Sequence, residues 1–115
     1  MKKLIEQYWK DMFAAVTTQD ANKIVQHFAP NAVYKCRTAS GMMDVDIKDL
    51  AESCLEYKET LDEQYSIDRV DELTNGVWSS IIISSVSKKP YFITSYFKFK
   101  DEKIIELIEY YGDFE

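Results

Sequence analysis

The second half of the chain constrains the fold most, because four strand-like segments follow one another there without any helical pattern. The segments cover residues 64–73, 77–87, 91–100 and 103–112, and they are rich in the β-branched and aromatic residues that favour strands. The residues between them, "TNG", "KKP" and "DE", are few enough for tight turns. Three consecutive hairpins predict an antiparallel meander.

The beginning of the chain predicts helices instead. Apolar side chains recur at helical spacing between Leu4 and Val16, which indicates a first helix with one apolar face. Tyr8, Trp9 and Met12 lie on that face, and we interpret them as core, with one of them as a candidate pocket floor. A short second helix follows, with Asp20 as its N-cap and an end at Pro30, because the residue before a proline is pushed out of the helical region.

A strand, a loop and a third helix complete the first half. "NAVYKCRT" (31–38) alternates as a strand does, and "ASGMMD" (39–44) is interpreted as a loop. The helical period returns at Asp46 and predicts a third helix that ends near Thr60. Helices followed by a strand meander are typical of an α+β domain whose helices cover one face of a curved sheet.

Composition excludes several classes of function. A chain of 115 residues suits one domain, and a net charge of −6 with scattered Lys and Arg disfavours nucleic acid and anionic membranes as partners. No apolar run reaches the ~20 residues of a membrane span, and the opening segment is too amphipathic for a signal peptide. We therefore expect a cytoplasmic protein. Cys36, Cys54 and the single His27 lack metal-ligand spacing, so we expect reduced thiols, no metal site and no cofactor.

Two passages carry a resemblance to a known family. The short helix that ends in "HFAPNAVY", and the aromatic strand that turns at "KDEK" into an apolar strand, look like the nuclear transport factor 2-like superfamily, in particular its SnoaL-like branch. "PN" stands where acidic residues are common in that family. The resemblance covers nearly the whole chain and implies a single domain over residues 1–115. Its implied architecture is a cone-shaped, cystatin-like α+β fold, with three N-terminal helices on a curved, mostly antiparallel sheet and a pocket at the wide end.

The same family holds enzymes, such as ketosteroid isomerase and polyketide cyclases, and non-catalytic binding domains. Matching the residues through "HFAPNAVYKC" puts Cys36 at the position of the isomerase's catalytic base, Met12 at that of its oxyanion-hole tyrosine and Ser95 at that of its oxyanion-hole aspartic acid. None of these residues can fill those roles, so the isomerase mechanism has no support. His27 lies in the short helix, where a histidine–aspartate pair of the cyclase type cannot be placed.

Strand alternation then selects the inward-facing residues. If Cys36 and Ser95 face inward, so do Tyr34 and Thr38 on the first strand and Ile93, Phe97 and Phe99 on the fourth. The resemblance implies that Leu107 lines the pocket, so Ile105, Glu109 and Tyr111 share its face and Glu106 points outward. Glu109 and Tyr34 are our catalytic candidates, and the candidate ligand-binding residues are Met12, Cys36, Ser95, Phe97, Leu107 and Tyr111.

The role of Glu109 is open at this point. Its carboxylate is either solvated at the pocket mouth or paired with Arg37 or Arg69, or it is a general acid or base whose pKa is raised by aromatic neighbours. Cys36 is either a small buried hydrophobe or, less readily, a nucleophile. Tyr34 and Tyr111 are either core aromatics or hydrogen-bond donors to a ligand.

Two functions follow from these alternatives. One is a pocket protein for a small apolar or aromatic molecule, with isomerase-, cyclase- or hydratase-like acid–base chemistry at Glu109 and Tyr34 or Tyr111 as donor. The other is a non-catalytic binding or assembly domain. A homodimer is expected in either case, because large apolar side chains also point away from the helices, with Lys98 and Glu106 at their rim. These side chains are Phe92, Tyr96, Ile104, Ile108 and Tyr110.

Overall fold

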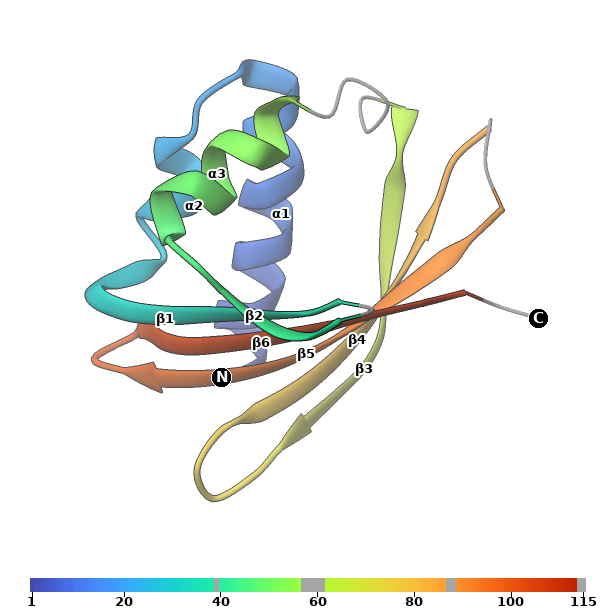
Figure 1. The fold of residues 1–115 in the computed structure, drawn as a ribbon. Helices are drawn as coiled ribbons and strands as arrows, with labels where there is room; N and C mark the ends of the chain where they lie inside the picture. Colours follow the sequence, from blue (N-terminus) through green and yellow to red (C-terminus); the bar gives the residue numbers. More distant parts are fainter. Residues whose placement is uncertain (39, 57–61, 87–88, 114–115) are drawn as a thin grey trace.

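The computed structural model describes residues 1–38, 40–56, 62–86 and 89–113. Helices come first and most of the strands follow, as Figure 1 shows. The helices are α1 (Lys2–Thr18), α2 (Asn22–Val25) and α3 (Ile47–Glu56). The strands are β1 (Phe28–Thr38), β2 (Gly41–Val45), β3 (Gln64–Glu72), β4 (Val77–Ser84), β5 (Tyr91–Lys100) and β6 (Lys103–Asp113).

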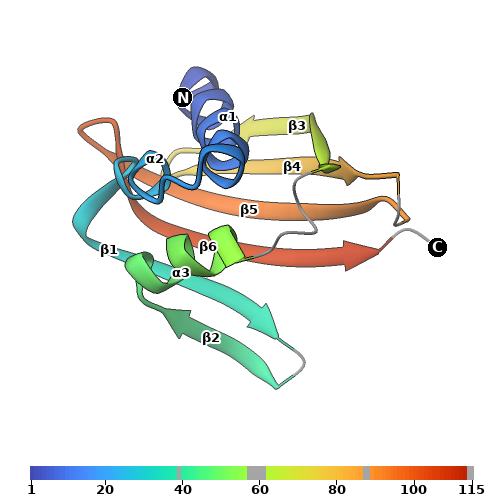
Figure 2. The same cartoon turned by 90° about the horizontal axis from the view of Figure 1, so that it is seen from above.

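The described strands form one curved sheet in the order β2-β1-β6-β5-β4-β3, which Figure 2 shows from above. β3 to β6 pair antiparallel in sequence order, so the predicted meander is confirmed. β1 lies parallel to β6 and antiparallel to β2. The first and last strands of the fold are therefore neighbours near the middle of the sheet.

Several predicted boundaries are wrong. The predicted loop 39–44 contains most of a strand, β2, which pairs with β1 from Gly41 to Val45. α2 ends at Val25 rather than at Pro30, which lies inside β1. The predicted end of the third helix near Thr60 lies outside the described residues, whose helix α3 ends at Glu56. Part of the predicted "KKP" turn also lies outside them.

The helices lie together on one side of the sheet, as Figure 1 shows, and they cover its concave, inner face. Tyr8 and Trp9 of α1 are both 0% exposed, and their rings meet Phe97 of β5 edge to face at centroid distances of 5.3 and 6.3 Å. Such aromatic contacts add to the stabilisation from buried apolar area. Among the described residues, no helix is long and apolar enough to cross a membrane.

An irregularity between β5 and β6 changes which residues face inward. Lys98 pairs with Glu106, whereas Phe99 pairs with Ile104, so the strand β6 contains one extra residue there, as in a β-bulge. Ile104 is consequently the fully buried residue, at 0% exposed, and Ile105 is only half-buried. The predicted inward position of Ile105 and the outward position of Ile104 are therefore wrong.

A pair of polar side chains fastens α1 to the start of β1. His27 Nε2 lies 2.7 Å from Asp11 Oδ2, and the His27 ring contacts the Tyr8 ring edge to face. The backbone N–H of Ile104 donates to the carbonyl of His27 at 2.8 Å. His27 thus ties the helical layer to β1 and β6.

Candidate functional site

A row of polar side chains crosses the inner face of the sheet. Strand register places Ser79 opposite Ser95, Ser95 opposite Glu109, and Glu109 opposite Cys36. Apolar pairs such as Val77–Phe97 and Ile81–Ile93 flank this row on either side. Four neighbouring strands therefore bring one polar residue each to a single line within an otherwise apolar face.

Glu109 is the centre of that row. Its side chain is 1% exposed, and both of its carboxyl oxygens accept hydrogen bonds. The Tyr34 hydroxyl donates to Oε1 at 2.7 Å, and the Ser95 hydroxyl donates to Oε2 at 3.1 Å. Tyr111, two residues further along β6, also acts on the pKa of this carboxyl. The two neighbouring strands β1 and β5 thus hold the acid in one orientation.

Burial raises the pKa of Glu109 above its ordinary value, because it removes water from the charged form. The hydrogen bonds from Tyr34, Ser95 and Tyr111 act in the opposite direction and only partly offset the burial. Burial, and then the charge on Glu109, raise the pKa of Tyr34, whereas the Glu109 charge is the main cause of the raised pKa of Tyr111. Both phenols therefore keep their protons at neutral pH and remain hydrogen-bond donors.

Of the two alternatives for Glu109, the one in which it is solvated or paired with Arg37 or Arg69 is wrong. Arg69 pairs instead with Asp71, at 2.6 Å between Nε and Oδ2. Among the residues that the structure describes, no salt bridge reaches Glu109. The carboxyl is therefore buried with hydroxyl groups around it and without a positive partner, a pattern that is more frequent at functional sites than elsewhere.

The structure brings most of the other candidate residues to the same face. Phe97 and Leu107 are 0% exposed, whereas Cys36 and Met12 are half-buried. Tyr111 is 54% exposed as a whole residue, although the charge on Glu109 is the main cause of its raised pKa, so this side chain lies between the buried acid and the surface. The roles assigned to these residues in catalysis or ligand binding stay predictions.

Sequence reasoning missed two contributors to the site. Ser79 is 2% exposed, and its inward position could have been found from the alternation of β4 with Val77 and Ile81. Cys54 of α3 is the second: burial, and then the charge on Glu109, raise the pKa of its thiol to about 12. No local pattern could have placed this helical thiol near the last strand.

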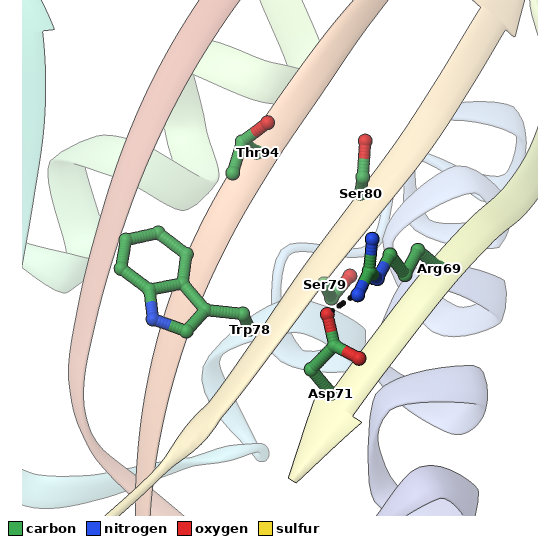
Figure 3. Close-up of a pocket in the computed structure, with 6 residues that line it drawn as sticks. All are labelled: Arg69, Asp71, Trp78, Ser79, Ser80 and Thr94. Atoms are coloured by element: carbon green, nitrogen blue, oxygen red, sulfur yellow. Dashed lines mark ion pairs between the residues drawn. The ribbon is translucent and has the colours of Figure 1, made fainter. Parts of the chain in front are cut away.

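Two hollows lie on the other face of the sheet, away from Glu109. One, of about 200 Å³, spans β3 to β5 and is drawn in Figure 3; its lining residues are Arg69, Asp71, Trp78, Ser80 and Thr94, together with Ser79, whose buried side chain belongs to the inner row beside Ser95. The second, of about 280 Å³, is lined by Asp68, Ser80, Ile82, Phe92 and Thr94. Ser80 and Thr94, which are register partners, line both hollows.

Comparison with solved structures decides the fold. A candidate ketosteroid isomerase from Kribbella flavida superposes with a TM-score of 0.72 at 12% identity, over 98% of this chain and 78% of that one. A nuclear transport factor 2-like protein of unknown function from Burkholderia xenovorans superposes with a TM-score of 0.71 at 15% identity, over 99% of this chain and 88% of that one. The chain has the nuclear transport factor 2-like fold.

A protein of unknown function with a cystatin-like fold, from Methylobium petroleophilum, is similar to this chain in the same way. Its TM-score is 0.70 at 20% identity, over 100% of this chain and 77% of that one. No family model and no curated protein matches the sequence. The predicted resemblance is therefore confirmed at the level of the fold, and a shared fold of this kind leaves function to be argued from the site.

Proposed function

We propose that this chain is a SnoaL-like protein that holds a small apolar or aromatic molecule on the inner face of its sheet and moves a proton on that molecule with Glu109. The observation that carries the proposal is a fully buried carboxyl, without a positive partner among the described residues, that the hydroxyl groups of Tyr34 and Ser95 orient. We expect the protein in the cytoplasm.

The protonation of Glu109 decides what it can do. A raised pKa keeps a proton on the carboxyl under conditions in which an exposed glutamate has lost it. The acid can then give this proton to an oxygen or carbon atom of the ligand, and Tyr34, Ser95 and Tyr111 stabilise the carboxylate that is left. Isomerisation, cyclisation and hydration all contain such a step.

The ketosteroid isomerase mechanism is not part of this proposal. The family resemblance puts Met12, Cys36 and Ser95 at the three positions of that enzyme's catalytic groups. Glu109 is the register partner of both Cys36 and Ser95, so the acid lies one strand away from either position. The proposal is therefore a proton transfer built on a different residue.

The test compares Glu109→Gln with Glu106→Gln. Both substitutions remove a carboxyl from β6, but Glu106 is only half-buried on the outer face. Exchange of the acidic C–H protons of 2-tetralone with D2O, followed by NMR, is the probe reaction. We expect Glu109→Gln to slow the catalysed exchange by about 10²-fold or more, which is typical for loss of a general acid or base. Exchange that is equally fast in Glu109→Gln and the unchanged protein would refute the proposal.

A second candidate function, an assembly domain, is favoured by the outer face of the sheet. The Trp78 ring lies 5.2 Å from that of Tyr96 and 6.4 Å from that of Tyr110, and Tyr110 is 39% exposed. Ile108 belongs to the same face, whereas the predicted member Ile104 is in the core. We propose a homodimer in which two copies of this aromatic face pack about a twofold axis.

Sedimentation velocity at micromolar concentration tests the dimer. We expect twice the 13.5 kDa mass of one chain, and we expect Ile108→Asp to give the single-chain mass, because it places an unpaired charge inside the interface. Asn22→Asp, which adds the same charge at an exposed position of α2 on the helical side of the sheet, is the control and leaves the dimer intact. A protein that sediments as a single chain before any substitution would contradict the proposal.

A further inference from the structure

Three buried polar groups have no hydrogen-bond partner among the described residues. They are the Tyr8 hydroxyl, the Trp9 indole N–H and the Ser79 hydroxyl. Tyr8 and Trp9 are 0% exposed and Ser79 is 2% exposed, so bulk water cannot satisfy them. Buried polar groups are almost always paired, and an unpaired one destabilises the fold. Three such groups in one small core indicate that something else supplies the partners.

The residues that carry the three groups all lie on or against the inner face near Phe97 and Ser95 of β5. The Phe97 ring contacts both the Tyr8 and the Trp9 rings, and Ser95, the next inward residue of β5, is the register partner of Ser79. Ser95 in turn donates its hydrogen bond to Glu109. The charge on Glu109 also contributes to the raised pKa of Tyr8, second to burial. The unpaired groups therefore border the acid on the side of α1 and β4.

The chemistry of the groups restricts what can pair with them. An indole N–H is a donor only, so its partner must be an acceptor, and both hydroxyls can donate to an acceptor as well. None of the three side chains carries a positive charge at neutral pH. An anionic ligand would therefore be buried without a counter-charge, and a cationic one would meet a donor-only N–H. An uncharged molecule with an oxygen acceptor fits best.

We infer that Tyr8, Trp9 and Ser79 form an acceptor-binding subsite, which takes a carbonyl or hydroxyl oxygen of an uncharged ligand beside Glu109. The inference rests on the proposed function, since it names the class of molecule on which Glu109 acts. In this arrangement the subsite positions the ligand oxygen through donated hydrogen bonds, and Glu109 handles the proton.

The experiment reads the Trp9 indole N–H directly by NMR. Trp78→Phe removes the other tryptophan, which is half-buried on the outer face, so a single indole N–H signal remains. Four probes of matched size are titrated to millimolar concentration: cyclopentanone, cyclopentane, cyclopentylammonium and cyclopentanecarboxylate. We expect cyclopentanone to shift the Trp9 signal saturably, and we expect cyclopentane and the two ions to bind at least about tenfold more weakly, which corresponds to one lost hydrogen bond at its upper range.

Substitutions then separate the subsite from the acid. We expect Tyr8→Phe and Ser79→Ala each to weaken cyclopentanone binding by about three- to tenfold and to leave cyclopentane binding unchanged. Equal binding of cyclopentanone and cyclopentane, preference for either ion, or a Trp9 signal that no probe shifts would overturn the inference. If one of these results occurs but Glu109→Gln still loses proton exchange, the subsite is refuted and the proposed function stands. If Glu109→Gln keeps proton exchange, the proposed function itself is refuted.

Discussion

The buried carboxyl of Glu109 makes a definite prediction about stability and pH. A group whose pKa is higher in the folded than in the unfolded protein binds its proton more tightly when folded. Its contribution to the free energy of unfolding is therefore fully present below the unfolded pKa, near the ordinary value of 4.5, and is lost as the pH rises through the folded pKa. Stability should consequently fall with rising pH in that window.

The magnitude follows from the number of protons involved. One proton that is bound in the folded state and released in the unfolded state changes the free energy of unfolding by about 1.4 kcal/mol per pH unit. Glu109→Gln removes this proton but keeps a side chain of similar shape, whose amide oxygen still accepts a hydrogen bond. The free energy of unfolding of the unchanged protein, minus that of Glu109→Gln, should therefore decrease by up to this amount with each pH unit above about pH 5.

Urea unfolding of both proteins between about pH 5 and about pH 8 measures the difference, because contributions that the two proteins share cancel. Glu106→Gln is the matched control, and its difference from the unchanged protein should vary much less with pH. A Glu109→Gln difference that stays constant across this range, or that grows with pH, would show that the carboxyl is not held protonated by its burial.

Two further predictions concern other parts of the fold. Gly76→Ala should lower the free energy of unfolding by about 1–3 kcal/mol, because an added Cβ would lie 2.7 Å from the carbonyl oxygen of Phe97 and 2.6 Å from the Tyr96 ring. Gly112→Ala should lower the free energy of unfolding by less, since there the added atom meets the tip of the Phe92 ring. Urea unfolding that ranks the two substitutions the other way would contradict this prediction. Iodoacetamide should alkylate Cys36 before Cys54, because burial raises the pKa of Cys54 to about 12 and only the thiolate reacts. Mass spectrometry that finds Cys54 modified first would be inconsistent with a buried Cys54 thiol at the site.

The sequence allowed the fold to be predicted wherever a periodic pattern was long. The apolar face from Leu4 to Val16 gave α1, and the four strand segments gave the meander. β2 was taken for a loop because three of its five side chains are exposed on an edge strand, so no apolar alternation marks it. Strand pairing supplied the signal that the local sequence lacked.

The candidate site was predictable only in part. The family resemblance implied inward positions for Cys36, Ser95 and Leu107, and alternation from them placed Tyr34 and Glu109 on the same face, because a period of two holds wherever strands are regular. It failed at Ile104, where the extra residue between β5 and β6 reverses the faces. The contacts of Cys54 and the pairing of Asp11 with His27 join different elements, so they depend on packing that a linear pattern does not encode.

The position of β6 has a consequence for how the protein is made. Tyr34 and Glu109 are 75 residues apart in sequence, and β6 lies between β1 and β5 in the sheet. Without β6, the described strands would form two separate pieces, the hairpin β1–β2 and the meander β3–β5. Closing the sheet therefore waits until the last strand has left the ribosome, and contacts of such large sequence separation form slowly. The acid that is costly to bury is carried by the strand that completes the fold, so the site and the closed sheet come into being together.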